Sequence, residues 1–468
     1  MRAAGLLLAA ACASCSVQAQ TQGTRAPQKY EALGRDILSE LIAIDTTVDR
    51  GSTVAAKAVA ARAIANGFPA ADVTLVTPKE RPDSSSLVIR LRGRSNARPV
   101  LYINHLDVVP AKREDWTFDP FRLTERDGWL YGRGTIDMKG QDAAVLASLI
   151  RLKQEGFVPA RDIVAAFTPD EETRAQWGVS WLLKTHRNLI DAAVVVNPDG
   201  GEAAMKKGRR LYVGVQTSEK IFVTFELEAT DKGGHSSRPT AENPIYRLSA
   251  ALARLSTHRF PLHLTETTRL YFERRAALES GQTAADMRAV LRQPPDMAAV
   301  DRLSAVVETN IQLRSTCTTT MIDGGHAENA LPQRARATVQ CRLIPGETQE
   351  SAAAAIRSAL ADPRVQVRVK TAAEVAPESK PAPEIFKLVE TVTRAMWPGV
   401  VVLPDMSAGA SDSVFTRAAG IPSYGIDGMF DDLDDARAHG KDERIGVAVF
   451  GEELEFTYRI MRTVGDLR

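Results

Sequence analysis

Residues 99–107 have the sequence Pro-Val-Leu-Tyr-Ile-Asn-His-Leu-Asp, an apolar run that ends in a histidine and an aspartate. The run is short and rich in β-formers, so it predicts a buried strand with His105 where that strand meets a loop. Further strands are predicted at 86–92, 163–167 and 193–197, and helices at 55–67, 142–154 and 178–184. Strands separated by helices of this length imply crossover connections. We therefore predict an α/β fold with a mostly parallel sheet.

The length of the chain and a change of pattern predict a second domain. At 468 residues the chain exceeds what one hydrophobic core usually supports. From about residue 220 the predicted strands alternate apolar and polar residues, as half-buried strands do. We predict an α+β domain at 216–375, inserted between two parts of the first domain at 30–215 and 376–468. The charged, helix-prone stretch 262–313 is expected to elaborate this insert.

Charge and hydropathy exclude several classes of partner. The chain has 59 basic and 58 acidic residues, a formal net charge of +1. This balance gives no electrostatic case for binding nucleic acid or an anionic membrane. Beyond the N-terminus, no stretch of the sequence is long and apolar enough to predict a membrane span.

The N-terminus has the pattern of a secretory signal peptide. Arg2 precedes an apolar run at 3–11, and residues 17–19, Val-Gln-Ala, resemble a cleavage site. We predict a signal peptide at 1–19 and a secreted protein, periplasmic in a Gram-negative host. Cys12 and Cys15 leave a lipoprotein as the alternative, although neither follows the leucine-containing small-residue box that lipidation requires.

Several polar residues follow predicted strands or lie in glycine-containing loops. Asp137 lies in the loop 132–140, Gly-Arg-Gly-Thr-Ile-Asp-Met-Lys-Gly, and Asp199 follows the strand at 193–197. Glu171 and Glu172 follow the strand at 163–167, and His439 comes late in the chain. In open α/β sheets, ligands bind beyond the carboxyl ends of the strands. Histidine and carboxylate are ligands that zinc accepts, so these residues predict a two-cation site.

Three motifs together carry a family resemblance. They are His105-x-Asp107-x-Val109-Pro110, the glycine loop Gly132-Arg133-Gly134-x-x-Asp137-Met138-Lys139-Gly140, and Glu171-Glu172. In combination they resemble the co-catalytic dizinc aminoacylase/carboxypeptidase family, metallopeptidase family twenty. The resemblance extends from about residue 30 to the C-terminus. It implies a dizinc catalytic domain with an inserted lid domain.

The resemblance also implies roles for the metal-site residues. One zinc would be bound by His105 and Asp199, the other by Glu172 and His439, with Asp137 bridging them. A bridging carboxylate suits cations ~3.5–4 Å apart, as in two-metal hydrolytic sites. Two Zn2+ per chain are expected, with Co2+ or Mn2+ as alternatives. Around His439 the sequence alone is equally compatible with a solvated acidic loop at 431–435.

Two acidic neighbours of the ligands receive catalytic roles. Asp107, two residues beyond His105, would accept the second ring N–H of the imidazole and fix its orientation. Glu171 is adjacent to a ligand without being one, so it would act as the general base toward the attacking water.

By the same resemblance, the lid contributes residues toward the substrate. His235, in the loop 233–239, would donate to the developing oxyanion, from the partner subunit in dimeric relatives. Asn329 and Arg342 match positions that bind the substrate carboxylate. Without the resemblance, the pattern around Arg342 favours a plain surface arginine on an edge strand. Gly409 and Ser411 are expected to shape the pocket wall, since their surroundings lack the Gly-x-Ser-x-Gly pattern of a serine hydrolase.

These observations predict an exported metallopeptidase that cleaves an amide bond next to a free carboxylate. Carboxypeptidase or dipeptidase activity is the first choice, and N-acyl-amino-acid hydrolysis (aminoacylase) is the alternative. The substrate would be a small peptide or an N-acyl amino acid, and a homodimer could form through the lid. The alternative from another class is an inactive peptide-binding protein, which would require a lost base or ligand.

Cys317 and Cys341 lie on two alternating segments, 315–322 and 336–344, that are expected to pair as antiparallel strands. If Ile322 faces Arg336, counting outward brings the two cysteines opposite each other, within reach of a disulfide. An oxidising compartment would preserve the bond. The alternative is two free buried thiols, which a register slip of one residue would produce.

Overall fold

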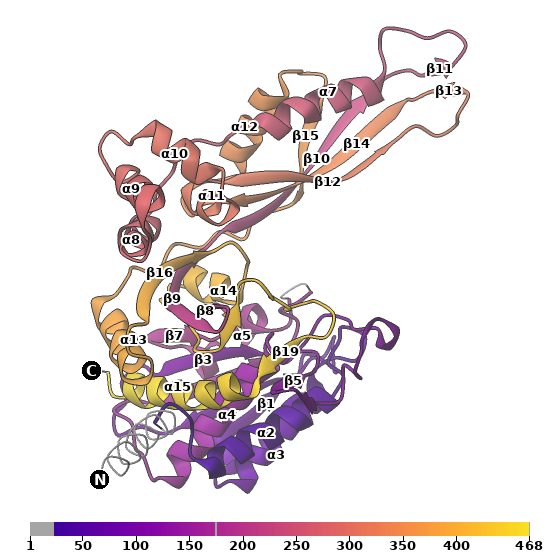
Figure 1. Ribbon diagram of the computed structural model, residues 1–468. Coiled ribbons are helices and arrows are strands. Elements are labelled where there is room, and N and C mark those ends of the chain that lie inside the picture. Colours follow the sequence, from indigo (N-terminus) through magenta and orange to yellow (C-terminus); the bar gives the residue numbers. More distant parts are fainter. Residues whose placement is uncertain (1–22, 174–175, 468) are drawn as a thin grey trace, which may run out of the picture. The chain divides into compact units, whose positions relative to one another are not determined.

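The computed structural model describes residues 23–173 and 176–467, which form two compact units (Figure 1). The signal peptide predicted at 1–19 lies outside the described residues. The first unit contains the N-terminal part of the chain up to Gln216 together with Pro381–Leu403 and Ser411–Arg468. The second contains Thr217–Lys380 and also Pro404–Ala410, a segment that the sequence analysis assigned to the catalytic domain.

Parallel strands form the centre of the first unit. β3 (Val100–His105) lies between β6 (Ile163–Thr168) and β7 (Val194–Asn197), and β17 (Ser423–Ile426) pairs with β7, all in parallel. Antiparallel strands flank this centre in a ten-stranded sheet. The α/β fold with a parallel central sheet is therefore confirmed.

Helices cover both faces of this sheet (Figure 1). Along β3, Val100 and Tyr102 belong to the core beneath α2 (Gln28–Ala43), α4 (Lys139–Gln154) and α15 (Val447–Gly465). Leu101 and Ile103 belong to the core beneath α5 (Val179–Thr185). A strand buried on both faces is apolar at nearly every position, which explains the unbroken apolar run in the sequence.

The remaining elements of the first unit complete the sheet edges and the helical layers. They are α3 (Thr53–Ala65), β1 (Val73–Val76), β2 (Ser86–Leu91), α6 (Arg187–Ile190), β8 (Glu202–Lys206), α13 (Pro383–Met396), α14 (Ser413–Ala418) and β18 (Phe430–Asp432). A separate three-stranded sheet contains β4 (Thr124–Arg126), β5 (Trp129–Tyr131) and β19 (Arg444–Gly446). Two strands, β9 (Arg209–Glu219) and β16 (Val401–Ser407), continue into the second unit.

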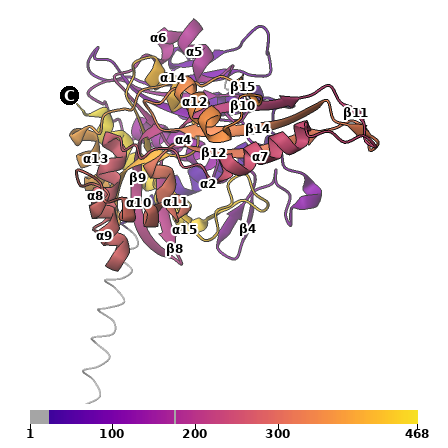
Figure 2. The same cartoon turned by 90° about the horizontal axis from the view of Figure 1, so that it is seen from above.

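An antiparallel sheet forms the centre of the second unit, in the order β12-β14-β10-β15. Its strands are β10 (Ile221–Thr230), β12 (Thr316–Gly324), β14 (Arg334–Leu343) and β15 (Gln366–Thr371). Alternate residues of β10 enter the core under α7 (Pro244–Thr257) and α12 (Gln349–Leu360), as the alternating sequence predicts. Figure 2 shows α7 running alongside β12 and β14, which it contacts.

Short elements complete the second unit. The stretch expected to be helix-prone forms α8 (Glu266–Arg275), α9 (Gly281–Ala289), α10 (Met297–Ser304) and α11 (Val307–Leu313). A separate two-stranded ladder pairs β11 (Gly234–His235) with β13 (Ala330–Leu331).

The predicted disulfide between Cys317 and Cys341 is present, with the two Cα atoms 4.1 Å apart. The register assumed near the turn is wrong by one residue, because Ile322 pairs with Ala337 and Arg336 pairs with Asp323. An irregularity between Thr319 and Met321 absorbs the extra residue before the cysteines. The cysteines therefore still lie opposite each other.

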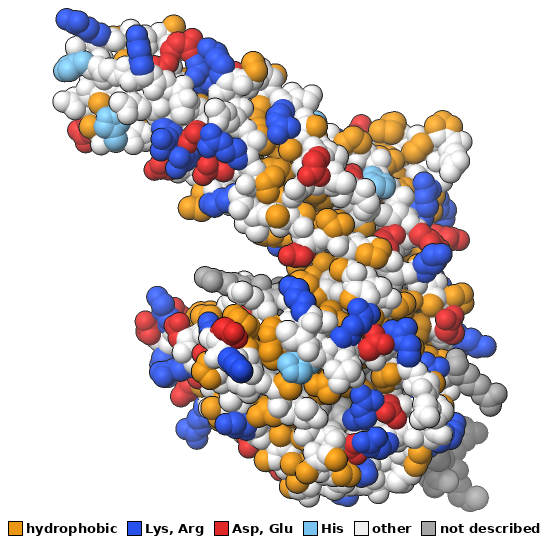
Figure 3. Space-filling model, turned by 180° about the vertical axis from the view of Figure 1, so that it is seen from behind, with side chains coloured by type: hydrophobic (Ala, Val, Ile, Leu, Met, Phe, Trp, Pro, Cys, Tyr) orange, Lys and Arg blue, Asp and Glu red, His pale blue; other side chains and the backbone are white. Residues whose placement is uncertain are grey.

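The surface and the helices give two further findings. Basic and acidic side chains are intermixed on the face shown in Figure 3. Among residues 23–173 and 176–467, none of the helices combines the length and the apolar character that crossing a membrane requires.

Candidate metal centre

The ends of three parallel strands bring the first predicted residues together. His105 is the last residue of β3, and Asp199 lies two residues beyond the end of β7. Glu171 and Glu172 lie in the loop that follows β6. Because β6, β3 and β7 are parallel neighbours, their carboxyl ends share one edge of the sheet.

Three residues form one group at this edge. Nε2 of His105 lies 3.1 Å from Oδ1 of Asp137 and 3.8 Å from Oδ1 of Asp199. The His105 side chain is only 2% exposed. Although close, His105 Nε2 and Asp137 Oδ1 are both buried without a hydrogen-bond partner, which suits atoms that hold a cation.

Three residues form a second group, which shares Asp137 with the first. Nε2 of His439 lies 2.9 Å from Oε1 of Glu172 and 3.0 Å from Oδ2 of Asp137. The ligand atoms within each group all lie within 4.8 Å of one another. Asp137 thus presents one carboxylate oxygen to each histidine, and the five residues fit two cations with a bridging carboxylate.

The carboxylates control the charge of the histidines. Burial disfavours the His105 cation, but Asp137 and Asp199 outweigh it and raise the pKa of His105 well above its usual value. Hydrogen bonds to Asp137 and Glu172 raise the pKa of His439 to about 10. Divalent cations would satisfy the same carboxylates and leave both imidazoles neutral, as metal ligation requires.

Glu171 differs from its neighbours in this network. Burial, followed by the negative charge of Asp199, raises the pKa of Glu171 well above that of an ordinary glutamate. Its carboxyl belongs to neither ligand group. A carboxyl with a raised pKa beside a cation site is suited to proton transfer.

Asp107 makes two different kinds of contact. The predicted contact with the His105 ring is made by its main-chain oxygen and not by its carboxylate. Nδ1 of His105 lies 3.1 Å from the main-chain oxygen of Asp107 but 3.7 Å from its carboxylate. The carboxylate instead accepts the N–H groups of Glu171, at 3.2 Å, and Glu172, at 3.0 Å. Burial raises the pKa of Asp107 to about 6. Asp107 therefore orients His105 through its main chain and the two glutamates through its side chain.

Known proteins carry the same sequence pattern over most of the chain. Residues 101–463 match the profile described as Peptidase family M20/M25/M40. The chain belongs to this family. It is therefore a hydrolase of the metallopeptidase/amidohydrolase type, with residue groups compatible with a dinuclear metal site.

Two relatives of this chain have names that describe different hydrolases. Human N-fatty-acyl-amino acid synthase/hydrolase PM20D1 is 27% identical over 408 residues, covering 84% of this chain and 80% of that protein. Probable carboxypeptidase S-like 2 of Dictyostelium discoideum is 28% identical over 391 residues, covering 81% and 74%.

Solved structures share the fold of this M20 family member. The metallo-carboxypeptidase Sso-CP2 from Sulfolobus solfataricus has a TM-score of 0.68 at 17% identity, covering 92% of this chain and 99% of that one. A Bacillus subtilis protein described as a dinuclear metal binding peptidase has a TM-score of 0.60 at 11% identity, covering 94% and 99%. At these identities the likeness concerns the fold alone.

Part of the glycine loop is structural. Lys139 is fully buried, and its Nζ donates to the main-chain oxygens of Leu41, at 2.9 Å, and Ile44, at 2.8 Å. Burial lowers the pKa of Lys139 to about 8. A Cβ at Gly140 would lie 2.4 Å from the oxygen of Thr135, so only glycine fits there. These two residues anchor the end of α2 and close the loop that carries Asp137.

Ser411 and Gly409 lie in different surroundings. Ser411 is buried, and its hydroxyl accepts a hydrogen bond from Nδ2 of Asn197, at 3.2 Å, at the end of β7. Asn197 also donates to Ser413, at 2.9 Å. Gly409 is exposed and belongs to the second unit. Sequence reasoning missed Asn197, because an asparagine at a strand end carries no signal of its own.

The predicted lid residues fall in two places within the second unit. His235 in β11 is exposed, and its Nδ1 lies 2.8 Å from the Ser237 hydroxyl. The main chain of Asn329 accepts from the N–H of Ser236 at 3.0 Å. Arg342 lies on β14, eight residues beyond the start of that strand at Arg334. At about 3.3 Å per residue, this is roughly 26 Å along the strand. The structure thus brings His235 and Asn329 together but not Arg342.

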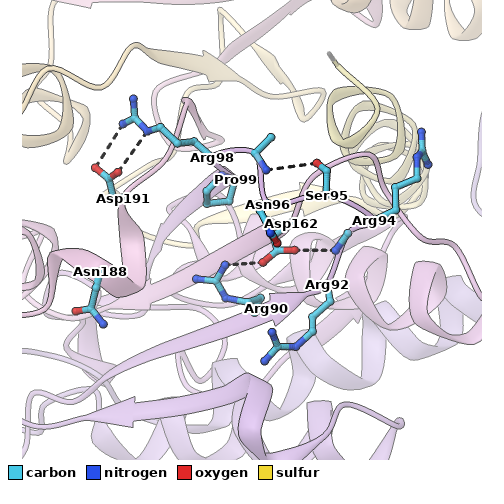
Figure 4. A pocket seen from close by; sticks show the side chains of 12 residues that line it. Arg90, Arg92, Arg94, Ser95, Asn96, Arg98, Pro99, Asp162, Asn188 and Asp191 are labelled. Atoms are coloured by element: carbon cyan, nitrogen blue, oxygen red, sulfur yellow. Dashed lines mark hydrogen bonds and ion pairs between the residues drawn. The ribbon is translucent and has the colours of Figure 1, made fainter.

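A pocket in the first unit is separate from the metal centre (Figure 4). It has a volume of about 570 Å³ and lies beside Pro99, at the end of β3 opposite to His105. Its arginines are paired with aspartates, Arg90 with Asp162 at 2.7 Å and Arg98 with Asp191 at 3.3 Å. These ion pairs stabilise the loop before β3.

Proposed function

We propose that the protein is a co-catalytic dizinc hydrolase that cleaves an amide bond next to a free carboxylate. The observation that carries this proposal is the position of Asp137, with one oxygen toward each of two histidines. His105 and Asp199 would hold one cation, and Glu172 and His439 the other. Zinc accepts this donor set best, with Co2+ or Mn2+ as alternatives.

The proposed chemistry requires a base close to the cations. When bound, two cations would polarise the substrate carbonyl and make water nucleophilic near neutral pH. Glu171 takes the proton from the attacking water and returns it to the leaving amine. Asp107 holds the Glu171 main chain during this transfer, since its carboxylate accepts the Glu171 N–H. Both steps use residues that lie at the same edge of the sheet.

Arg342 is proposed to bind the substrate carboxylate, and Asn329, which lies with His235 far from Arg342, is proposed to reach it from the partner subunit of a homodimer. The Arg342 guanidinium lies 5.0 Å from the centre of the Phe222 ring, and burial lowers its pKa. Contact with an aromatic ring restricts the motion of the guanidinium, and its fork of donors suits a carboxylate. His235, far from Arg342 along the second unit, is proposed to act on the oxyanion from the partner subunit of a lid-mediated homodimer.

Carboxypeptidase or dipeptidase activity is the first choice of substrate class. Hydrolysis of N-acyl amino acids is the second, and it is favoured by the similarity to the N-fatty-acyl-amino acid synthase/hydrolase over most of the chain. Both substrates release an amino acid with a free carboxylate through the same metal centre. They differ in the group that occupies the other side of the amide bond.

We further propose that the protein is exported to the periplasm. The pattern at residues 1–19 supports this, because it has a charged start, an apolar run and a cleavage-like site. The disulfide between Cys317 and Cys341 also supports an oxidising compartment.

A hydrolysis screen tests the proposal. The purified protein, loaded with Zn2+, is offered dipeptides, N-acetyl amino acids and N-fatty-acyl amino acids, each as the free acid and as the amide. We expect cleavage of acids over amides, with Arg342→Ala removing that preference, and release of the free amino acid measured by mass spectrometry. Little or no zinc in the purified protein, together with no turnover of any substrate, would favour the inactive peptide-binding protein instead.

A further inference from the structure

A buried ion pair connects the loops that carry two of the proposed ligands. Nη1 of Arg133 donates to Oε2 of Glu443 at 2.6 Å, and the two side chains are 3% and 0% exposed. Arg133 follows β5 and Glu443 precedes β19, and these two strands pair antiparallel. The Arg133 guanidinium also lies over the Trp116 ring, 5.0 Å from its centre.

Each member of the pair holds the main chain of one loop. Nη2 of Arg133 donates to the main-chain oxygens of His439, at 3.2 Å, and Gly440, at 3.1 Å. His439 has a φ of 62°, a left-handed conformation that is unfavourable for a residue other than glycine. Such a conformation persists only where neighbouring contacts impose it. Arg133 supplies two of these contacts.

Glu443 acts in the same way on the other loop. Its Oε2 accepts the N–H of Gly134 at 3.0 Å, and its Oε1 accepts those of Ile136, at 2.7 Å, and Asp137, at 3.1 Å. One carboxylate therefore fixes three main-chain donors of the loop that carries the proposed bridging ligand. A glutamate buried this deeply is stable only because these donors and Arg133 satisfy it.

The first ligand group is supported differently. His105 ends β3 and Asp199 follows β7, and these two strands are paired within the central sheet. Neither residue has a hydrogen bond to Arg133 or Glu443 among the contacts of the described chain. Loss of the ion pair would thus disturb the main chains of His439 and of the shared ligand Asp137, while His105 and Asp199 keep their own support.

We propose that Arg133 and Glu443 are positioning residues that set the affinity of one of the two metal positions, the one held by Glu172 and His439. This inference rests on the proposed dizinc function. Supporting residues of metal ligands typically contribute 10–100-fold to metal affinity. We expect a loss of that size at one position and little change at the other.

Metal-binding isotherms of the full-length protein, measured with Zn2+ and a competing chelator, test the inference. The variants are Glu443→Gln and Arg133→Met, with Arg133→Lys carrying the same expectation where Arg133→Met does not fold. The matched controls are Glu455→Gln and Arg151→Met, which break another ion pair of the same unit, 2.7 Å long, away from the ligand loops. Thermal unfolding of each variant reports its stability separately.

The expected result is two tight positions in the parent and controls, and one position weakened about 10–100-fold in the Arg133 and Glu443 variants. Combined variants show which of the two metal positions is weakened. Arg133→Met should add no further loss to His439→Ala, but should weaken the metal that remains in Asp199→Ala. Equal weakening of both positions, or none, would overturn the inference. Failure of the parent to bind two metals would instead overturn the proposed function.

Discussion

His105 and Asp199 are held by the ends of core strands, whereas Glu172 and His439 are held by loops. The histidines show the difference most clearly, since the His105 side chain is 2% exposed and the His439 side chain 53%. The position of a strand end is fixed by the hydrogen bonds between the strands of the sheet. A loop ligand instead depends on a few side chains that bind its main chain. The strand half of the site (His105 and Asp199) should therefore tolerate distant substitutions better than the loop half (Glu172 and His439).

Removing Asp137, the ligand shared by both halves of the site, should affect both halves equally. In Asp137→Ala both proposed cations lose a ligand, so we expect metal content to fall toward zero. Because the metals supply several kcal/mol of transition-state stabilisation, activity should fall by roughly 10³-fold or more. Elemental analysis after gel filtration and a hydrolysis assay measure the two effects. Retention of both metals by this variant would show that Asp137 is not the bridge.

Removing the proposed base should leave both halves intact. Glu171→Gln keeps the size of the side chain and lies in neither ligand group. We expect two metals per chain and a loss of about 10²–10⁴ in kcat, the usual contribution of a general base. Steady-state kinetics and elemental analysis on the same preparation test this. A near-normal rate would remove Glu171 from the mechanism.

Asp107→Asn should affect the loop half more than the strand half. The asparagine keeps the main-chain oxygen near His105 but has only one side-chain acceptor for the N–H groups of Glu171 and Glu172. We expect a loss of about 10–100-fold in activity and in the affinity of the Glu172 position. Metal titration compares this variant with the parent. A weakened His105 position instead would mean that the carboxylate, and not the main chain, orients that imidazole.

A pH experiment separates stability from metal binding. Burial raises the pKa of Asp427 to about 7, and burial and the charge of Asp427 raise that of Glu453 well above its usual value. The folded protein therefore keeps a proton that the unfolded chain releases near pH 4. Stability from this pair is present below pH 4 and is lost as pH rises toward 7 and beyond.

Glu453→Gln should remove this dependence. The amide mimics the protonated acid, and its oxygen can still accept the Gly428 N–H that Glu453 accepts at 2.9 Å. Thermal melts from pH 5 to 9 should show a smaller decline of the midpoint in the variant, with metal content unchanged. An identical slope in parent and variant would contradict the view that Glu453 keeps a proton in the folded protein.

The strand that ends in His105 is predicted by its own sequence pattern, whereas the ligand roles of both halves are predicted only by the family resemblance. An unbroken apolar run ending in His105 carries its own structural signal, since a strand buried on both faces has few other compositions. His439 lies in an acidic loop whose conformation is imposed by Arg133, 306 positions earlier in the chain. Local patterns contain no information about such a contact.

Other features of the fold were also missed because they depend on contacts between distant segments or on irregular pairing. The second unit was recognised from its alternating strands, but the inclusion of 404–410 depends on contacts between distant segments. The pairing of Cys317 with Cys341 was predicted through a register that is wrong near the turn, because an irregularity at Thr319–Met321 leaves no trace in composition. The separation of His235 and Asn329 from Arg342 follows from the length of β14, which the sequence gives only approximately.

The bridge between Cys317 and Cys341 also has a consequence for assembly. β12 is the outermost strand of its sheet, and Met321 and Ile322 on it are 64% and 63% exposed. Outermost strands of this kind can leave their sheet and enter that of another molecule. A covalent bond to β14 keeps β12 in its own chain, so strand exchange between copies requires reduction first. Protein made in a reducing cytoplasm would therefore be the form most prone to strand exchange between copies.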